Sequence, residues 1–338
     1  MQRIAVVLLN WNGLDLLKKF LPSVVKHSSE AVVYVADNAS TDASRTFIAE
    51  NNPEVKWIQL PQNYGYAKGY NEALKQINEE ILCLINTDIE VTEHWLQPVL
   101  NIFETQADIG IIQPKILDYN NKNYFEYAGA AGGFIDKYGF PFCRGRIFDT
   151  IEKDENQYPS QEIFWASGAC LFVRKSVFQQ LNGFDETFFA HQEEIDFCWR
   201  AFNQNITTYY CAESTVFHVG GATLKKSNPK KTYLNFRNSL YMLYKNLPEQ
   251  NRFGILFKRL CFDGLAGIKF LFALQPLHTL AVVKAHFAYY AQLKHLKNKT
   301  SQNPKANYFY TLSIVEAYFF QKKKRFPEVP KSFFTLNT

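Results

Sequence analysis

A run of five apolar residues, Ile81–Ile85, constrains the fold of this chain more than any other feature. Such an uninterrupted run is typical of a strand that is buried on both faces of a parallel sheet. It ends in the polar side chains of Asn86, Asp88 and Glu90, and Thr92 is placed to cap a following helix. Open α/β sheets bind ligands beyond the carboxyl ends of their strands, where oxygen ligands of this kind suit Mg²⁺ or Mn²⁺ on a diphosphate. The alternative is a plain turn, because Asn and Asp favour strand ends for backbone reasons alone.

Three further apolar runs precede this strand and alternate with helical patterns. Strands that alternate with helices predict a parallel sheet with helices packed against its faces. We therefore expect an α/β fold with a mostly parallel sheet, and we expect the polar residues after each strand to meet at its carboxyl edge. The strands are expected over residues 4–9, 31–36 and 55–60, and the first two helices over residues 14–26 and 40–51. The glycine-rich stretch 63–71 is expected to open a third helix that reaches about residue 77.

Polar clusters that could contact a nucleotide follow these strands. Asp37 ends the second strand and could accept hydrogen bonds from a base or ribose. The glycine spacing in the third cluster matches neither a dinucleotide-binding fingerprint nor a P-loop. Turn formation explains each cluster taken singly, and the repetition of polar strand ends along one edge is what indicates a nucleotide-sugar site. The candidate residues are Asn10, Asn12, Asp37, Asn63, Gly65 and Asn71.

The order of these motifs resembles family 2 glycosyltransferases of the GT-A fold, over roughly residues 4–240. Within that family the chain looks most like the bacterial rhamnosyltransferase-like branch. The resemblance implies that Asp37 binds the base, that Asn86 and Thr87 contact the nucleotide sugar, and that Asp88 binds the metal as the last residue of an Asp-x-Asp motif. Asn86 stands where that motif has its first carboxylate, so it adds no charge. The segments that carry the resemblance are VVLLNWN at 6–12, ADNASTD at 36–42, NYGYAKGYN at 63–71 and NTD at 86–88.

Residues 113–160 carry weaker patterns. Glycine-rich stretches at 129–133 and 138–141 predict turns between short strands, which we interpret as an insertion near the acceptor side. Residues 164–174 then predict one strand with a glycine kink at Gly168.

A second chemical centre follows at residues 191–200. Apolar residues at helical spacing predict a helix that places Glu193, Glu194 and Asp196 around its first turn. Acidic residues there also favour the helix dipole, which is the structural alternative. In the resembling family an acidic pair occupies this position, and its second member is the catalytic base. That residue is Glu194 here, with Glu in place of the commoner Asp, and Glu193 and Asp196 are expected to support the acceptor side.

His218 ends a later predicted strand. A lone histidine at such a place is more often structural, but the resemblance implies that it binds the metal together with Asp88, because imidazole suits manganese as well as zinc. Gly220, Gly221 and Thr223 indicate a mobile loop over the product diphosphate. Arg237 resembles part of the family's C-terminal helix and is expected on the acceptor side.

The charge of the chain divides it into two expected domains. Residues 1–224, the catalytic domain, hold 17 Lys and Arg against 28 Asp and Glu, whereas residues 225–338 hold 20 against 4. This basic, mainly helical second region is rich in Phe, Tyr and Leu, which fits an anionic membrane surface, and no nucleic-acid motif is visible. It has no uncharged run of 18 apolar residues, so interfacial helices are expected rather than a spanning one. The alternative is a helical unit that packs its own core or forms a homodimer.

Six scattered cysteines without a Cys-x-x-Cys pair indicate reduced thiols and neither a zinc site nor a disulfide framework. Residues 1–3 lead directly into a strand and leave no room for a signal peptide. We therefore expect a cytoplasmic protein, peripheral at the inner face of the cell membrane.

These features predict an inverting glycosyltransferase that uses Mg²⁺ or Mn²⁺ and a UDP- or dTDP-linked sugar. The expected acceptor is a hydroxyl of a lipid-linked or cell-surface glycan, for example a polyprenyl-diphosphate-linked sugar in lipopolysaccharide, O-antigen or capsule synthesis. The alternatives are a glycoside hydrolase, which needs paired carboxylates but no metal, a non-catalytic nucleotide-sugar binder and a nucleotidyltransferase.

Overall fold

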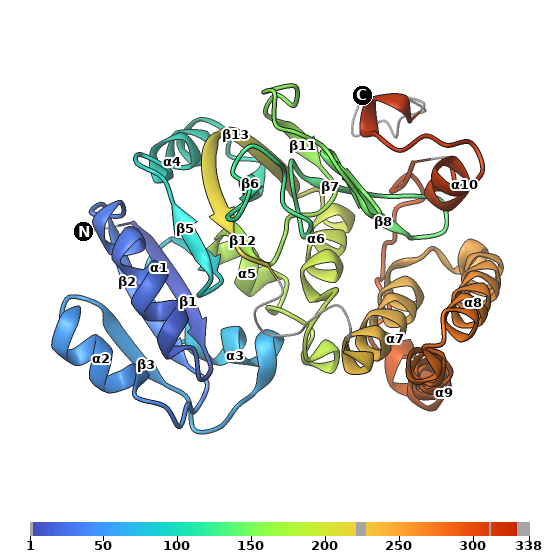
Figure 1. Cartoon of the computed structure of the whole chain (residues 1–338), viewed down its shortest axis with the longest axis horizontal. Helices are drawn as coiled ribbons and strands as arrows, with labels where there is room; N and C mark the ends of the chain where they lie inside the picture. The colour runs from blue at the N-terminus through green and yellow to red at the C-terminus, as the bar shows by residue number, and fades with distance from the viewer. Residues whose placement is uncertain (1–2, 221–227, 311, 330–338) are drawn as a thin grey trace.

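A computed structural model describes residues 3–220, 228–310 and 312–329. Its N-terminal half alternates strands and helices as predicted, and β4, β1, β2 and β3 lie side by side in parallel register (Figure 1). These elements are β1 (Ile4–Asn10), α1 (Leu14–Lys26), β2 (Ala31–Asp37), α2 (Ser44–Asn51), β3 (Lys56–Gln59), α3 (Gly65–Leu74) and β4 (Ile81–Ile85).

Both faces of these strands are buried, which explains their unbroken apolar sequences. In β1, Ala5 and Val7 point into one hydrophobic core together with residues of α3, whereas Val6 and Leu8 point into a second core together with residues of α1. Successive side chains of a strand point to opposite faces, so a strand between two helical layers needs apolar residues at every position.

The other half of the sheet is mixed. The strand order is β11-β13-β6-β12-β4-β1-β2-β3, with β5 paired to β13. β12 is antiparallel to both β4 and β6, whereas β13 is parallel to β6. The α/β prediction is confirmed, with antiparallel pairings that the sequence patterns did not indicate. The elements of this half are β5 (Ile89–Val91), α4 (Leu96–Thr105), β6 (Ile109–Asp118), β11 (Gln161–Ile163), β12 (Cys170–Arg174), α5 (Lys175–Gln180), η1 (Glu186–Phe188), α6 (Glu193–Asn203) and β13 (Thr207–His218).

Two local predictions were wrong. Thr92 does not cap a helix: its hydroxyl donates to the carbonyl oxygen of Thr215 at 2.7 Å, and α4 begins only at Leu96. The strand predicted over residues 164–174 is reduced to β12, because the backbone turns at Gly168 before it joins the sheet.

The weakly patterned stretch after β6 forms the short strands expected of it, arranged as a separate four-stranded sheet. The end of the chain packs back onto this sheet, where the rings of Tyr310 and Phe326 lie 5.3 and 6.2 Å from the ring of Phe142. Residues beyond 225 therefore share a hydrophobic core with residues of the first half. The strands are β7 (Gly133–Ile135), β8 (Pro141–Cys143), β9 (Arg146–Ile147) and β10 (Thr150–Ile151).

The C-terminal region is helical, as predicted. Figure 1 places α7–α9 on the opposite side of the molecule from β1–β3. None of the described helices is both long and apolar enough to cross a bilayer. The expected boundary at 224/225 and the expected loop residues Gly221 and Thr223 lie outside the described residues. The helices are α7 (Pro229–Asn246), α8 (Glu249–Phe272), α9 (Pro276–Lys297), α10 (Ile314–Phe319) and η2 (Phe326–Glu328).

Candidate active site

The carboxyl ends of β1 and β2 meet at Asp37, whose side chain is almost fully buried. Its Oδ1 accepts a hydrogen bond from Asn10 Nδ2 at 2.9 Å, and its Oδ2 accepts from the backbone N–H of Ser40 at 2.8 Å and from Gln59 Nε2 at 3.2 Å. The parallel register of the two strands sets Asn10 directly beside Asp37. Two of the predicted nucleotide contacts therefore lie together, and the Asp37 carboxylate is held in one orientation.

Asn12 lies in the turn after β1 and contacts the loop that follows β2. Its Oδ1 accepts from the backbone N–H of Thr41 at 2.7 Å, and its own N–H donates to Ser40 Oγ at 2.8 Å. A left-handed φ of 50° at Asn12 turns the chain so that both bonds form. Asn12 thus fixes the loop that follows β2, and its acceptor oxygen is already occupied.

The glycine-rich stretch ahead of α3 packs against the protein itself. Asn63 Oδ1 accepts from the backbone N–H of Gly65 at 2.9 Å. Gly65 has a φ of 74°, and a Cβ on it would lie 2.7 Å from the Phe189 ring, a contact that requires glycine. The N–H of Tyr66 donates to the carbonyl oxygen of Phe189 at 2.9 Å. The segment around residue 189 thus approaches Gly65 closely.

Asn71 is also used within the fold. Its Nδ2 donates to the carbonyl oxygen of Phe184 at 2.8 Å, and its Oδ1 accepts from the N–H of the same residue at 2.9 Å. Both functions of the amide are engaged, so Asn71 positions the segment that leads to the acidic pair.

Asp88, at the end of β4, lies against His218, at the end of β13. His218 Nε2 is 3.1 Å from Asp88 Oδ1, and His218 Nδ1 is 3.3 Å from Glu126 Oε2. All three side chains are buried. Burial lowers the pKa of His218, but its contacts with the Asp88 and Glu126 carboxylates outweigh burial and raise the pKa to about 10.

This arrangement fits a divalent ion that has two protein ligands. Glu126 faces Nδ1, the nitrogen away from Asp88, and carboxylates in that position commonly orient a metal-binding imidazole. Asp88 Oδ1 and His218 Nε2 then converge as an oxygen and a nitrogen ligand. Across the described parts of the chain, no three His, Cys, Asp or Glu side chains form a cluster that could hold a metal. Phosphate oxygens of a donor would therefore have to complete the coordination.

Asn86 and a turn before β12 connect this pair to the acidic centre. Asn86 Nδ2 lies 3.4 Å from His218 Nε2, and the Asn86 N–H donates to the carbonyl oxygen of Ala169 at 2.9 Å. At the neighbouring Gly168, a Cβ would lie 3.7 Å from the Cβ of Glu194. Asn86 and Glu194, more than 100 residues apart in sequence, therefore border the same turn.

Thr87 lies between Asp88 and the loop after β1. Its hydroxyl oxygen is 3.8 Å from the position that a Cβ would take on Gly13, and the side chain is half-buried. The predicted contact residues Thr87 and Asn10 therefore flank the same short turn at Gly13.

A strained backbone segment presents the acidic pair. Phe189, His191 and Gln192 have φ values of 65°, 69° and 73°, a left-handed conformation that is costly for residues with a Cβ. α6 begins directly afterwards at Glu193. One carboxylate oxygen of Glu193 and one of Glu194 are buried without a hydrogen-bond partner among the described residues. Unpaired buried carboxylate oxygens at a strained segment indicate a functional site.

The electrostatics distinguish the two glutamates. Burial raises the pKa of Glu194 to about 7, against the opposing effect of backbone N–H groups at the start of α6. Burial, and then the charge of Glu194, raise the pKa of Glu193 well above its ordinary value. With a pKa of about 7, Glu194 can accept a proton near neutral pH.

α7 holds the strained segment in place. Asn238 Nδ2 donates to the carbonyl oxygens of Phe188, Ala190 and His191 at 3.0, 2.9 and 2.7 Å. Arg237 donates to the carbonyl oxygen of Phe188 at 3.0 Å. Arg237, expected on the acceptor side, thus supports the acidic segment through its backbone.

Asp196 is a structural anchor. It is fully buried, and its carboxylate accepts from Lys245 Nζ, Asn246 Nδ2 and Arg200 Nε, each at 2.8 Å. Burial raises its pKa, but Lys245 and Arg200 outweigh burial, and the net pKa is lowered. Its expected supporting role takes the form of an ion pair that joins α6 to α7.

Comparison with known proteins identifies the family. The sequence model of the family described as glycosyl transferase family 2 matches residues 5–181, which include Asn10, Asp37 and Asp88. The chain belongs to glycosyl transferase family 2.

Relatives of this family 2 glycosyltransferase act in glycan synthesis. The hexosyltransferase Agl10 of low-salt glycan biosynthesis in Haloferax volcanii is 25% identical over 241 residues, 70% of this chain and 73% of that protein. The N-acetylglucosaminyl-diphospho-decaprenol L-rhamnosyltransferase of Mycobacterium tuberculosis is 26% identical over 218 residues, 60% of this chain and 71% of that protein.

A solved structure supports the GT-A fold of this glycosyltransferase. The structure of GalNAc-T7 with UDP, GalNAc and Mn²⁺ superposes with a TM-score of 0.52 at 16% identity, covering 64% of this chain and 42% of that one. At this level of identity the likeness establishes the fold only.

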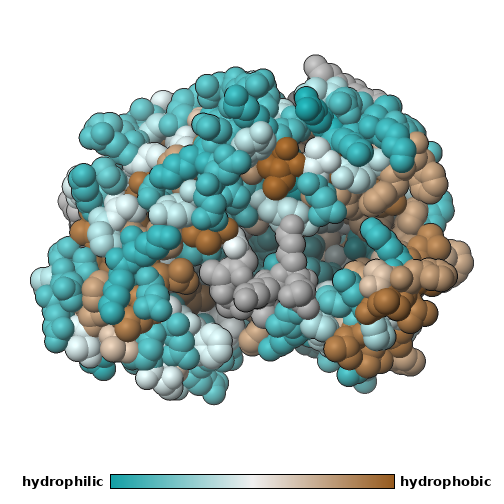
Figure 2. All heavy atoms as spheres, in the orientation of Figure 1, coloured by the Kyte–Doolittle hydropathy of each residue, from teal (hydrophilic) through white to brown (hydrophobic). Residues whose placement is uncertain are grey.

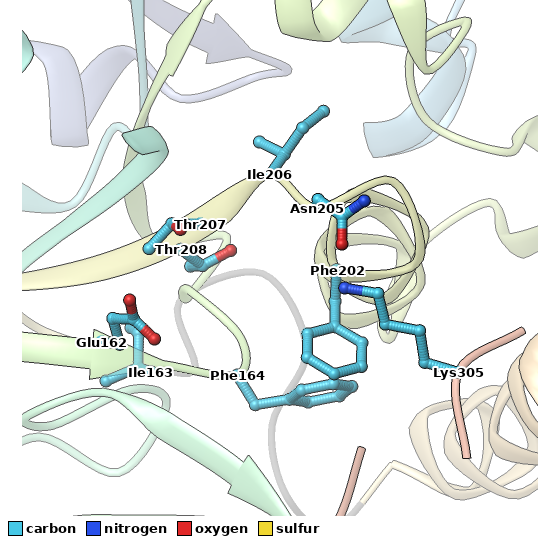
Figure 3. Close-up of a pocket in the computed structure, with 9 residues that line it drawn as sticks. All are labelled: Glu162, Ile163, Phe164, Phe202, Asn205, Ile206, Thr207, Thr208 and Lys305. Atoms are coloured by element: carbon cyan, nitrogen blue, oxygen red, sulfur yellow. The ribbon is translucent and has the colours of Figure 1, made fainter. Parts of the chain in front are cut away.

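A pocket elsewhere in the glycosyltransferase contains none of the predicted site residues. It lies between β11, the end of α6 and the start of β13, where Lys305 Nζ sits 4.5 Å from the centre of the Phe202 ring (Figure 3). Thr207 and Thr208 line it at the opposite end of β13 from His218. Its position separates it from both chemical centres.

Sequence reasoning missed Glu126. It lies in the weakly patterned stretch, and no motif or spacing marks it. Only the fold brings it to His218.

Proposed function

We propose that the protein is an inverting glycosyltransferase that transfers a sugar from a nucleoside-diphosphate donor to an acceptor hydroxyl. The observation that carries this proposal is the shared turn at Gly168 and Ala169, which borders Glu194 and also Asn86, whose amide lies 3.4 Å from His218 of the Asp88–His218 pair. Glu194 accepts the proton of the acceptor hydroxyl as its oxygen attacks the anomeric carbon, and the nucleoside diphosphate departs on the opposite side. One base without a separate nucleophile implies a single displacement and inversion.

For the donor we propose a UDP- or dTDP-linked sugar held along the carboxyl edge of the sheet. In this proposal Asp37 and Asn10 contact the base at one end of that edge. Asn86 and Thr87 lie nearer the sugar and the diphosphate. Asp88 and His218 would hold Mg²⁺ or Mn²⁺, in keeping with the Mn²⁺ and UDP named in the GalNAc-T7 structure. When bound, the ion neutralises the charge that develops on the leaving diphosphate.

For the acceptor we propose a lipid-linked glycan, with transfer of a hexose or rhamnose at the inner face of the membrane. The name of the mycobacterial relative specifies a decaprenol-linked acceptor, and that of the archaeal relative specifies a hexosyltransferase. The basic C-terminal region supports a peripheral location for the same reaction.

A donor screen tests the proposal. Purified protein is incubated with UDP- and dTDP-sugars, Mn²⁺ or Mg²⁺ and a polyprenyl-diphosphate-linked acceptor, and we expect metal-dependent release of nucleoside diphosphate and an inverted anomeric linkage by NMR. Asp88→Ala should abolish transfer and weaken UDP binding in the presence of Mn²⁺. Full activity after chelator treatment would contradict the metal assignment. Release of pyrophosphate, cleavage of a glycoside without nucleotide, or binding without turnover would contradict the reaction.

A further inference from the structure

The hairpin of α8 and α9 exposes large apolar side chains to an unusual degree. Figure 2 shows apolar side chains gathered over these two helices, at the lower right. Phe253, Phe272 and Leu274 are 82%, 84% and 88% exposed, and Phe257, Leu277 and Phe287 are also mostly exposed. Clustered exposed apolar residues mark an interaction site, whereas single ones are ordinary. We call the exposed side of α8 and α9 between Phe253 and Tyr290 the hairpin face.

α8 is apolar on its outward side as well as on its inward side, where Leu256 is buried in the core. Its inward side holds a buried ion pair, with Arg259 Nε 2.9 Å from Asp263 Oδ1, and Arg259 also donates to the carbonyl oxygen of Gly139. Its outward side carries Phe253, Phe257 and further apolar residues at helical spacing. A helix on a water-exposed surface normally turns its apolar side inward, so packing within the chain does not explain this arrangement.

The charge on the hairpin face has one sign. Between Glu249 and Glu316 the sequence contains a single carboxylate, Asp263, which is buried and paired. Lys258, Lys269 and Lys284 are exposed among the apolar side chains. A surface that is both cationic and apolar complements an anionic lipid surface. It is poorly suited to a symmetric contact with a second copy, because lysines would then face lysines.

We propose that the hairpin face docks on an anionic membrane surface, with its phenylalanines inserted at the boundary between headgroups and acyl chains and its lysines against anionic headgroups. The helices lie along the membrane and do not cross it. This docking does not depend on the proposed reaction, so it can be tested without a donor or an acceptor.

The test uses the full chain and vesicles of phosphatidylcholine with or without phosphatidylglycerol, measured by sedimentation. We expect binding to anionic vesicles that is at least roughly tenfold tighter than to neutral ones and is weakened by salt. The triple variant Lys258→Glu, Lys269→Glu and Lys284→Glu should bind anionic vesicles at least roughly tenfold more weakly, because each lysine near such a surface contributes roughly fivefold.

A matched control separates location from net charge. Lys18, Lys26 and Lys153 are exposed on other parts of the protein. Replacing these three with Glu changes the net charge by the same amount and should leave vesicle binding within about twofold of wild type if only nearby charges act at this ionic strength. Equal losses in the two triple variants would overturn the proposal.

The apolar part is tested with Phe253→Ser, Phe272→Ser and Phe287→Ser together. Because these side chains are exposed, we expect an unchanged melting temperature and at least roughly tenfold weaker binding to anionic vesicles. Absence of wild-type binding at low salt would overturn the proposal, as would equal binding to both vesicle types. A lipid-free dimer that the phenylalanine substitutions dissociate, without any vesicle binding, would instead assign the face to self-association.

Discussion

Two pairs of buried carboxylates, Asp185 with Asp196 and Glu193 with Glu194, lie in or near the start of α6 and differ in their counter-charges. Asp185 and Asp196 share Lys245, whose Nζ is 2.6 and 2.8 Å from them. Glu193 and Glu194 have no ion-pair partner among the residues that the structure describes, and each keeps an unpaired buried oxygen.

The comparison shows that burial alone does not decide the role of a carboxylate. Burial acts to raise the pKa of all four carboxylates. Near Lys245 the attraction of the cation exceeds this effect, and the pKa of Asp185 and that of Asp196 are lowered. Without a cation the pKa of Glu194 rises to about 7. The Asp185–Asp196 pair therefore joins α6 to α7 through Lys245, and Glu194 is prepared to exchange a proton.

The largest expected effect comes from removing the shared cation. Lys245→Met leaves two buried carboxylates with reduced compensation, and we expect a loss of about 3–5 kcal/mol in the free energy of unfolding, measured by urea denaturation. Lys299→Met is the control, because Lys299 also pairs with Asp185 but is about one-third exposed. Its loss should stay within about 1 kcal/mol. Equal losses would show that the buried pairing contributes little.

For the Glu193–Glu194 pair we expect the opposite: a loss of turnover with little change in folding. Glu194→Gln should leave folding and donor binding nearly intact and reduce turnover by at least roughly 10²-fold, the usual effect of losing a general base. Donor binding by calorimetry and single-turnover rates would check this. If Glu193→Gln lost turnover while Glu194→Gln did not, the base would be Glu193.

A further buried carboxylate, Glu126, sharpens the comparison, because it faces a histidine and no lysine. Glu126→Gln should weaken Mn²⁺ binding in the presence of UDP by roughly 10- to 100-fold, since it orients the imidazole of His218. Titration calorimetry measures this directly. Glu90→Gln, which changes a half-buried carboxylate on β5 that pairs with Lys122, should leave Mn²⁺ affinity unchanged, and an equal loss there would remove the special role of Glu126.

The smallest effect is a difference in the pH dependence of stability. The folded pKa of Glu194 lies above that of an unfolded glutamate, so its contribution is present at low pH and is lost as pH rises through about 7. The lowered pKa of Asp196 has the opposite consequence, with stability lost as pH falls below the ordinary range of carboxylates. Glu194→Gln should therefore be more stable relative to wild type at pH 8 than at pH 4. Parallel unfolding curves at the two pH values would refute the raised pKa.

Sequence patterns predicted the half of the fold in which each strand is buried on both faces. β4 was expected over Ile81–Ile85 and is found there, because unbroken apolar runs with polar ends have few alternatives. β6 was missed, since Pro114 and Lys115 interrupt its pattern. The Lys115 side chain is buried only because Asp154 and Asn156 accept its hydrogen bonds at 2.8 Å, and those partners come from a distant loop.

The site was predictable to the extent that strand ends define it. Asp37, Asn10, Asp88 and His218 occupy neighbouring positions at one edge because the sheet register sets them there. Gly65 and Asn71 were assigned to a nucleotide because their types suit close approach and hydrogen bonding. The same properties serve the protein's own backbone at residues 184–189, and the sequence does not distinguish these two uses.

The amide of Asn238 limits how this protein can vary. Its two N–H bonds are shared among three carbonyl oxygens. Aspartate has the same size but an oxygen in place of that nitrogen, and this oxygen would repel the backbone carbonyl oxygens. A shorter hydroxyl has one hydrogen to donate, and a longer amide would have to displace the backbone. Evolutionary substitution of Asn238 is therefore restricted by the number of hydrogen-bond donors that the site requires. Deamidation of Asn238 to aspartate would release the segment that presents Glu194.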